Sequence, residues 1–389
     1  MTKEQNKKAP NLRFKSFTND WEQRKLGDVA KVTMGQSPSS KNYTDNPNDY
    51  VLVQGNADLK SNEISPRVWT KEVTKQVHEG EFIMTVRAPV GYLAMANMDA
   101  VIGRGVAAID GNKYLYYLLQ TKLLDRTWEK LSSGSTFESI SSNDIKNLEI
   151  KVTETEEEKL IAKLMNTVTY FVTLQQRKLE LLSQLKQGLI QQNILNQALL
   201  NSSSSWPSYK LKDLLKVRKK LQIPDIKYPL ASFTVEKGVT SKTSRYNREF
   251  LVQTHNKKYK STEYHDIVYN PANLKFGAIA LNKFGKATIS PIYETLVPSS
   301  KCNVYFLTLI ITSPDFIHKA LKYQEGTVYE RMAVKVNDLL SMSIHLPNID
   351  TQVKFGEFFY GLDELIYATK NKLEKYQLIK KSLLQQMFI

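Results

Sequence analysis

The chain contains one helical phrase written twice, and this repeat constrains its fold more than any other feature. KLELLSQLKQGLIQQNIL occupies residues 178–195, and KLEKYQLIKKSLLQQMFI occupies residues 372–389. Seven of the 18 positions are identical at a constant offset of 194 residues. A repeat at such a spacing indicates a duplicated structural unit rather than one continuous domain.

Other paired stretches follow in the same order along the two halves. They are WEQRKLGDVAKV (21–32) with WPSYKLKDLLKV (206–217), GEFIMTVRAPVGYLAM (80–95) with HDIVYNPANLKFGAIAL (265–281), GSTFESI (134–140) with GTVYERM (326–332), and NDI (143–145) with NDL (337–339). Their offsets grow from 185 towards 194, as small insertions between diverged copies produce. The order of the matches predicts an internal duplication.

The repeated phrase belongs to two long predicted helices, each with a coiled-coil seam. Apolar residues recur at alternating spacings of three and four, which is the coiled-coil pattern. The seam residues are Val168, Val172, Leu179, Leu182 and Leu189 in the first copy and Leu362, Ile366, Leu373, Tyr376 and Leu383 in the second. Polar residues share the register, Gln175 with Thr369 and Lys186 with Lys380.

Such wide apolar faces need a partner. In a duplicated chain the two copies tend towards a two-fold arrangement, which pairs the helices antiparallel. We therefore predict an antiparallel pair within the chain. The alternatives are a helix that packs on its own globular segment and a helix that pairs with another chain.

The segments between the helices read as short strands and turns. Apolar β-rich runs lie at 50–55, 81–86, 92–96 and 100–109, and at 228–235, 248–254, 266–270 and 277–284, with short helices at 113–131 and 314–323. These patterns predict an α+β protein with an internal pseudo-two-fold duplication. Two strand-rich mixed α/β domains, at 1–152 and 201–347, are joined by two long antiparallel coiled-coil helices at 153–200 and 348–389.

The distribution of charge favours a polyanionic partner. The net charge is +15, and residues 201–347 hold 22 Lys and Arg side chains against 11 Asp and Glu. Residues 21–152 hold 16 of each. A cationic surface is typical of nucleic-acid binding, and the alternative is a basic surface that serves solubility alone. Because the first half is neutral, any binding face there has to be local.

Composition also bears on location. Cys302 is the one cysteine, so a disulfide framework is excluded and a reducing compartment is favoured. No apolar run approaches the ~20 residues of a membrane helix. The polar start lacks the apolar core of a secretory signal. We expect a cytoplasmic protein.

Catalytic and metal-binding motifs are missing from the sequence. It contains no G-x-x-x-x-G-K-[ST] phosphate loop and no G-x-G-x-x-G after a strand. Its histidines lack the spacing of zinc ligands. The NPAN stretch at 270–273 loosely resembles the loop of amino-methyltransferases, but its second Pro and its aromatic residue are missing, so a turn is favoured. We predict a protein that is not itself an enzyme and holds no metal.

Basic, amide and aromatic residues interleave in both halves, as in DNA-binding surfaces. Lys and Arg neutralise phosphates, and Arg, Lys, Asn and Gln read base edges. The candidates are Lys41, Tyr43, Gln54, Asn56, Arg67, Trp69, Arg87 and Arg104 in the first half and Lys242, Arg245, Tyr246, Arg248, Lys257, Lys258, Tyr259 and Lys260 in the second. For each of these taken singly, the alternative is a solvated surface residue.

The chain resembles the specificity subunits of type I restriction–modification systems from about Asn11 to its end. The resemblance rests on KLGDVAKV (25–32) and KLKDLLKV (210–217), on GSTFESISSNDIKNLEI (134–150), and on the helix ends LIQQNI (189–194) and LLQQMF (383–388). The second copy departs from the pattern, since GTVYERMAVKVNDL carries a two-residue insertion and its long helix lacks the acidic start ETEEEK.

This resemblance implies a non-catalytic DNA-binding subunit of a bacterial defence complex. Each globular segment is then a target recognition domain for one half of a bipartite, asymmetric DNA site. The helices set the unread spacer and dock two methyltransferase subunits, and two motor–endonuclease subunits join them. The complex methylates adenine and cuts DNA with ATP, so S-adenosylmethionine, ATP and Mg²⁺ belong to the partner subunits.

Two other classes of function remain open at this point. One is a coiled-coil scaffold for complex assembly that does not read DNA, with its charge incidental. The other is an enzyme in its own right. Failure to bind any duplex together with a methyltransferase partner favours the first, and methyl transfer or ATP hydrolysis by the isolated chain favours the second.

Overall fold

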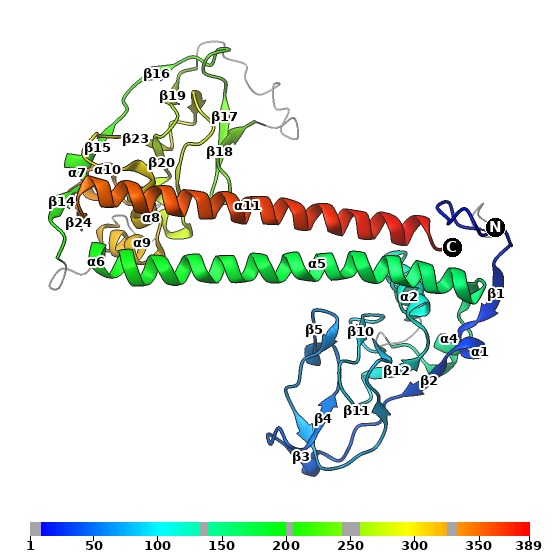
Figure 1. Cartoon of the computed structure of the whole chain (residues 1–389). Helices are drawn as coiled ribbons and strands as arrows, with labels where there is room; N and C mark the ends of the chain where they lie inside the picture. The colour runs from blue at the N-terminus through cyan, green and yellow to red at the C-terminus, as the bar shows by residue number, and fades with distance from the viewer. Residues whose placement is uncertain (1–8, 133–138, 200–204, 243–256, 325–332) are drawn as a thin grey trace. The chain divides into compact units, whose positions relative to one another are not determined.

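The computed structural model describes residues 9–132, 139–199, 205–242, 257–324 and 333–389 (Figure 1). The chain forms two compact units. Unit 1 consists of Met1–Arg177 and Lys370–Ile389, and unit 2 of Lys178–Thr369. Each unit therefore contains one globular head and part of both long helices. The predicted domain division instead separates the heads from the helices.

The head of unit 1 is built on two main sheets. One has the strand order β2-β12-β9-β10-β6-β5 and the other β3-β7-β4-β11-β8, while β1 pairs with β13. The strands are β1 (Glu22–Lys25), β2 (Lys31–Met34), β3 (Tyr43–Thr44), β4 (Tyr50–Val53), β5 (Leu59–Lys60), β6 (Glu63–Ile64), β7 (Trp69–Thr70), β8 (Gln76–Val77), β9 (Phe82–Thr85), β10 (Leu93–Met95), β11 (Ala100–Ile102), β12 (Val106–Asp110) and β13 (Glu149–Val152).

The helices of unit 1 enclose its larger core. They are α1 (Leu26–Val29), α2 (Lys113–Leu124), α3 (Thr127–Ser132), α4 (Ser142–Lys146) and the first part of α5 (Thr155–Ile190). Buried aromatic residues of α2 and α3, among them Tyr114, Tyr117 and Trp128, pack with β9 and with the end of the C-terminal helix. A second core lies between strands of the two sheets, around Val53 and Ile83.

Unit 2 has smaller sheets, in the orders β15-β23-β20-β21, β16-β19-β22, β17-β18 and β14-β24. Its strands are β14 (Ser208–Lys210), β15 (Leu215–Val217), β16 (Leu221–Gln222), β17 (Ala231–Thr234), β18 (Gly238–Ser241), β19 (Tyr259–Thr262), β20 (Ile267–Tyr269), β21 (Ile279–Leu281), β22 (Ala287–Ile289), β23 (Glu294–Pro298) and β24 (Ser343–His345). Its helices are α6 (Asn196–Leu199), α7 (Leu211–Leu214), α8 (Val304–Ile311), α9 (Pro314–Ala320), α10 (Val336–Ser341) and α11 (Ile349–Gln386), the last of which continues into unit 1.

The two units repeat the same internal plan. In unit 1 the opening strand β1 pairs antiparallel with β13, the strand that precedes the long helix, and in unit 2 β14 pairs with β24 in the same way. A short helix, α1 or α7, follows each opening strand. The antiparallel pair β9–β10 corresponds to β20–β21. The predicted duplication is therefore present in the fold.

The long helices pack antiparallel within each unit, side by side in Figure 1. In unit 1, Phe171 stacks on Tyr376 with ring centroids 5.3 Å apart. In unit 2, Lys186 Nζ lies 2.5 Å from Asp363 Oδ1. The α11 partner falls in number as the α5 residue rises, which is the antiparallel arrangement that the repeat predicts.

The predicted seam is the buried face of both helices. Each predicted seam residue is buried or half-buried: Val168, Val172, Leu179, Leu182 and Leu189 on α5, and Leu362, Ile366, Leu373, Tyr376 and Leu383 on α11. Gln175 and Thr369 are buried as well. After Ile190, a π-helical turn (Gln191–Leu195) leads into α6.

Most predicted head elements are present, with three differences. The predicted helix at 113–131 forms two helices, α2 and α3, with a break at residues 125–126. The run at 100–109 forms two strands rather than one, because residues 103–105 turn the chain between β11 and β12. The apolar run Val304–Ile311, for which no element was predicted, forms α8, and the side chain of its N-cap Asn303 accepts a hydrogen bond from Phe306 N. The predicted strand at 248–254 lies wholly outside the described residues.

No helix among the described residues has the length and apolar character needed to cross a bilayer.

Candidate nucleic-acid interface

Unit 1 contains a polar hollow of about 620 Å³ at the ends of several strands. It is lined by Ser37, Pro38, Ser39, Ser40, Tyr43, Gln54, Gly55, Asn56, Arg87, Ala88, Arg104 and Gly105. These residues come from the connection before β3, from the turn after β4, from the segment after β9, and from the turn between β11 and β12. The fold thus brings Tyr43, Gln54, Asn56, Arg87 and Arg104, all predicted from the sequence, to one place.

One buried carboxylate shapes the turn that carries the two amides. Asp58, only 7% exposed, accepts hydrogen bonds from the backbone N–H groups of Gln54 (2.8 Å) and Gly55 (3.3 Å). Arg67 donates to Ala57 O at 3.2 Å and lies 3.8 Å from Asp58 Oδ1. These contacts fix the backbone of the turn, and its side chains line the hollow from that fixed backbone.

A second carboxylate holds the opposite wall. Glu72 accepts hydrogen bonds from Ser39 N at 2.8 Å and Asn42 Nδ2 at 2.7 Å. The hydrogen bond from Asn42, followed by that from Ser39, lowers the pKa of Glu72. The carboxylate therefore stays ionised at neutral pH and keeps the serine-rich segment in place.

Close backbone packing beneath the hollow depends on glycines. A Cβ on Gly35 would lie 2.1 Å from Gly103 O, and one on Gly105 would lie 2.1 Å from Gln54 O. Real Cβ atoms do not come so near, so these segments can meet only where a side chain is missing. The position of Gln54 thus depends on Gly105.

The lining suits the edges of bases more than a small metabolite. Asn and Gln form paired hydrogen bonds with adenine, and Arg with guanine. Arg87, Arg104 and Asn56 are exposed, whereas Tyr43 and Gln54 are half-buried. Serine hydroxyls add donors and acceptors on the other wall. The arrangement can bind a nucleic-acid segment by direct contact.

The other candidates of the first half lie elsewhere. Lys41 is exposed on the short 3-10 helix Ser40–Asn42 and does not line the hollow. Arg67 does not line the hollow, and instead stabilises the turn that contains Asp58 through its contacts with Ala57 O and Asp58. Trp69 is half-buried in β7, where the strand pairs with β3 and β4. Arg67 and Trp69 thus have structural contacts that their sequence context does not reveal.

In unit 2 the four candidates at 257–260 lie in β19 or directly before it, in the sheet β16-β19-β22. Lys257 and Lys258 are exposed at the start of β19, and Lys257 Nζ lies 5.7 Å from the centroid of the Tyr259 ring. Lys260 is paired with Glu294 at 2.8 Å, so its charge is neutralised within the protein. Lys242 is exposed after β18. Arg245, Tyr246 and Arg248 lie outside the described residues.

Two further lysines, missed in the sequence, lie beside Tyr228 in the connection that follows β16. Lys220 and Lys286 lie 5.0 Å and 5.9 Å from the centroid of the Tyr228 ring. The Tyr228 hydroxyl donates to Glu263 Oε1 at 2.5 Å, and this bond raises the pKa of Tyr228. Lys286 is far from Lys220 and Tyr228 in the sequence, so the interleaved pattern that marks the 257–260 stretch could not reveal the three together.

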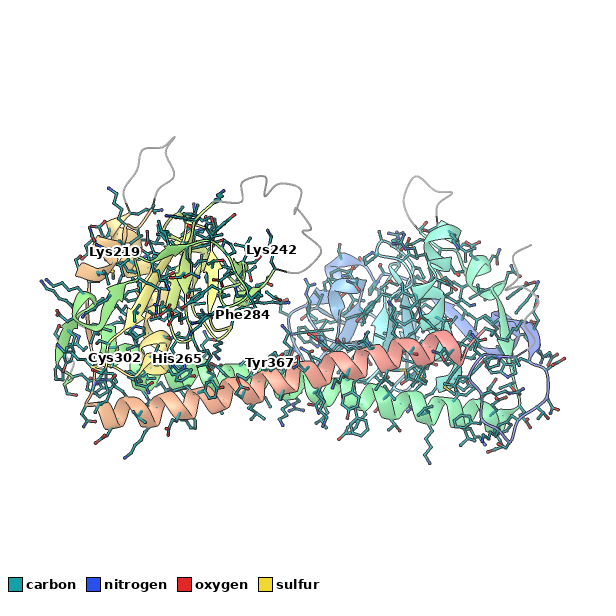
Figure 2. All side chains as sticks on the ribbon, turned by 90° about the horizontal axis from the view of Figure 1, so that it is seen from above. Lys219, Lys242, His265, Phe284, Cys302 and Tyr367 are labelled. Carbon is teal, nitrogen blue, oxygen red and sulfur yellow. The ribbon has the colours of Figure 1, made fainter. Side chains whose placement is uncertain are left out.

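The cationic surface of unit 2 lies away from the long helix. Figure 2 places Lys219 and Lys242 on the part of the head remote from α11, whereas His265 and Cys302 lie beside that helix. Beneath the surface, Arg218 donates two hydrogen bonds to buried Asp266, at 2.8 and 2.9 Å. Arg218 is therefore part of the scaffold, and the neighbouring Lys219 and Lys220 supply the accessible charge.

The sequence also missed the residues that position the hollow of unit 1. Asp58 and Glu72 lie in segments whose charges are locally balanced, so they read as ordinary surface carboxylates. The one available signal for Asp58 is the QGNAD stretch (54–58), in which a carboxylate can accept hydrogen bonds from backbone N–H groups a few residues earlier. Among the described residues, no group of His, Cys, Asp and Glu is arranged to hold a metal ion.

Comparison with known proteins agrees with this geometry. Residues 18–184 match the type I restriction modification DNA specificity domain. The MjaIX specificity subunit of a type I restriction enzyme from Methanocaldococcus jannaschii is 23% identical over 410 residues, which cover 95% of this chain and 92% of that protein. The chain is therefore similar to a type I specificity subunit over nearly its whole length, and residues 18–184 match the DNA specificity domain.

Two further relatives extend the comparison. A second Methanocaldococcus jannaschii protein, named as the MjaX specificity subunit, is 29% identical over 179 residues, which cover 44% of this chain but only 42% of that protein. The crystal structure of the S subunit from M. genitalium is similar with a TM-score of 0.68 at 16% identity, covering 98% of this chain and 99% of that one. The type I specificity subunit therefore shares the fold over nearly the whole chain.

Proposed function

We propose that this chain is the DNA-reading subunit of a type I restriction–modification complex, with each head reading one half of a bipartite, asymmetric site. The observation that carries the proposal is the hollow of unit 1, where Gln54, Asn56, Arg87 and Arg104 converge. These are side chains that read base edges. The cationic sheet of unit 2 supports binding to a second stretch of backbone phosphates.

The test is to map the methylated bases in DNA exposed to the chain assembled with its methyltransferase partner. The expected result is a site in two parts separated by an unread spacer. Gln54→Ala and Arg104→Ala should each relax one part only, and each should reduce the discrimination between bases by about 1–3 kcal/mol. The exposed Lys60→Ala on β5 is the matched control. A change in both parts, or in neither, would refute the assignment of this hollow.

We further propose that α5 and α11 set the length of the unread spacer. The support is the antiparallel pairing of their described residues and their uninterrupted helical course through Thr155–Ile190 and Ile349–Gln386. Inserting one heptad into each helix, after Arg177 and after Thr369, adds about 10 Å of helix. That is about three base pairs at ~3.4 Å each. The two half-sites should stay the same, and a changed half-site would contradict the proposal.

Partner docking is a third part of the proposal. Each unit carries three apolar residues at corresponding positions of its helix segments, and we treat each set as one apolar face: Leu164, Phe171 and Ile379 in unit 1, and Phe358, Leu365 and Leu185 in unit 2. Five of these are exposed, from 37% for Phe171 to 54% for Phe358. Two chemically alike faces suit two copies of one partner. We assign them to two methyltransferase subunits.

Mass measurement of the complex tests this assignment. Phe171→Glu should remove one methyltransferase subunit, and Leu365→Glu should remove the other, because a buried carboxylate without a partner is costly. The double variant should bind none. Retention of both subunits by the double variant would exclude these faces as the docking sites.

The remaining chemistry is assigned to partner subunits. We propose that S-adenosylmethionine lies on the methyltransferase subunits, that ATP and Mg²⁺ lie on two motor–endonuclease subunits, and that the complex works in the cytoplasm. The isolated chain should therefore neither transfer methyl groups nor hydrolyse ATP. Either activity in the purified chain would overturn this part.

A further inference from the structure

The two seam lysines of the repeated phrase lie in different surroundings. Lys186 on α5 is paired with Asp363 in unit 2. Its counterpart Lys380 lies on α11 in unit 1, where the position that corresponds to Asp363 is occupied by Thr169. Among the described residues, Lys380 has no ion-pair or hydrogen-bond partner. Its Nζ lies over the Tyr117 ring, 5.8 Å from the ring centroid.

Lys380 lies in the wall of a hollow of about 330 Å³ in unit 1. Two cations, Lys380 and Lys381, line it together with apolar side chains that include Leu123, Leu124, Val172 and Leu384. Leu123 and Leu124 are 36% and 46% exposed, which is unusual for residues of an otherwise buried helix. None of the described residues that line the hollow is acidic.

Most of the residues that line this hollow belong to helices. Leu123 and Leu124 end α2, Val172 belongs to α5, and Lys380 and Leu384 belong to α11. Helices that pack on one another hold side chains more firmly than loops do. The hollow is therefore a built feature of unit 1, and its volume lies at the lower end of the range for sites that bind small molecules.

A half-buried ammonium group without a counter-charge is unfavourable. Burial lowers the pKa of Lys380, and no neighbouring carboxylate acts against this effect. In unit 2, Asp363 supplies the counter-charge for the corresponding lysine, Lys186. In unit 1 the missing negative charge would have to come from outside the chain, and the apolar walls would contact whatever carries it.

We propose that this hollow binds a small organic anion with an apolar body, whose carboxylate or sulfonate group is bound by Lys380 and Lys381. The apolar body lies against Leu123, Leu124 and Leu384. Because Lys186 is already paired with Asp363, we expect no equivalent site around Lys186 among the described residues of unit 2. The proposal is thus of one such ligand per chain, in contrast to the two alike faces proposed for the methyltransferase subunits.

Two dyes with the same rings test the proposal on the full chain. Anilinonaphthalene sulfonate carries one negative charge, and phenylnaphthylamine is its uncharged counterpart. We expect the sulfonate to bind with saturation at one site per chain. Lys380→Met should weaken its binding about tenfold, as loss of a charged hydrogen bond does, and should change the binding of the uncharged dye less than about twofold. Lys375→Met, an exposed lysine on the same helix, is the control.

A labelling experiment on the unmodified chain avoids reliance on the fold of a variant. Acetic anhydride should acetylate Lys380 and Lys381 more slowly when the sulfonate dye is bound, while Lys375 is unaffected, as read by mass spectrometry. Absence of protection would overturn the proposal. It would also fail if Lys380→Met left the affinity for the sulfonate unchanged, or weakened both dyes equally.

Discussion

The two units use the same interior plan with different side chains at corresponding places. In unit 1, Asn112 caps α2 and its amide donates to Glu158 at the start of α5, at 2.7 Å. In unit 2, Asn303 caps α8 and its backbone N–H donates to Gln352 at the start of α11, at 3.0 Å. The corresponding residues Glu158 and Gln352 both tie the head helix to the long helix.

The surfaces of the heads differ far more than these internal contacts. The head of unit 1 holds equal numbers of acidic and basic side chains over residues 21–152, and it gathers amides, guanidinium groups and hydroxyls around one hollow. Unit 2 exposes lysines on a small sheet and stacks two of them on Tyr228. Internal contacts constrain both copies to one scaffold, whereas the surfaces are free to diverge. We infer that the half-site read by unit 1 depends more on base contacts, and that binding by unit 2 depends more on phosphates.

The largest expected change in the free energy of unfolding concerns an ion pair that unit 1 has and that unit 2 lacks at the corresponding position. Arg13 donates two hydrogen bonds of 2.7 Å to Glu157, whose side chain is fully buried. At the position that corresponds to Glu157, unit 2 has Thr351. Arg13→Met leaves this carboxylate without its cation and should lower the free energy of unfolding by about 3 kcal/mol, as measured by thermal and chemical denaturation.

The matched control is Arg24→Met. Arg24 pairs with Glu22 at 3.4 Å on the exposed strand β1, and such surface pairs contribute about 0–1 kcal/mol. An equal loss of stability in both variants would mean that the buried pair has no special role in unit 1.

The same pair predicts a dependence on pH. Burial by itself raises the pKa of Glu157, but the hydrogen bonds from Arg13, Thr153 and Trp21 and the charge of Arg13 outweigh it and leave the pKa below its ordinary value of 4.5. The pair therefore stabilises the fold above that value, and this contribution is lost as the pH falls through the folded pKa. The stability gap between the wild type and Arg13→Met should narrow in acid, and a gap that stayed constant would contradict the pairing.

A smaller effect is expected at the glycines beneath the hollow of unit 1. Gly105→Ala places a Cβ against Gln54 O and should cost about 2 kcal/mol, as overpacking does, while moving the amide-bearing turn. Gly55→Ala, in the same turn, meets nothing within 4 Å and should be nearly neutral. Binding to DNA altered only in the unit 1 half-site should report the difference. Equal binding by the two variants would argue against the hollow.

Salt dependence can distinguish the two heads. If Lys257 and Lys258 each contact a phosphate, the double change to Ala should reduce the slope of log K against log salt by about 2, since each phosphate contributes about 0.9. Arg104→Ala in unit 1 should alter sequence preference more than slope. An unchanged slope in the unit 2 variant would remove these lysines from the interface.

The smallest expected effects concern the seam lysines, and they should differ in sign. Lys186→Met breaks a partly exposed pair with Asp363 and should lower stability by up to about 1 kcal/mol. Lys380→Met replaces a half-buried, unpaired ammonium by an apolar side chain and should raise stability by about 1 kcal/mol. Thermal unfolding of the ligand-free chain is the measurement. Changes of the same sign would mean that the two lysines have similar surroundings.

Much of the architecture follows from local sequence pattern. The seam from Val168 to Leu189 and its copy from Leu362 to Leu383 could be predicted because helical periodicity is a property of neighbouring residues. The strands at 81–86 and 92–96 could be predicted for the same reason. The α8 helix could not, because an apolar run such as VYFLTLII fits a buried strand as well as a helix and only its packing decides between them.

Only part of the candidate site could be predicted from the sequence. Residue types capable of reading bases could be selected, and Tyr43, Gln54, Asn56, Arg87 and Arg104 do meet around one hollow. That Arg67 braces a turn and Lys260 pairs with Glu294 could not be foreseen, because both partners are brought near by the fold.

The sequence by itself determined the duplication, the two long helices and the face by which they pack, since each is encoded by periodic residues close together in the chain. Only the tertiary structure decided which charges are paired and which are not. Lys186 and Lys380 occupy the same place in the same repeated phrase, yet one meets a carboxylate and the other an aromatic ring. The reason is that an electrostatic partner is chosen by distance in space, and distance in space is set by every element that packs nearby.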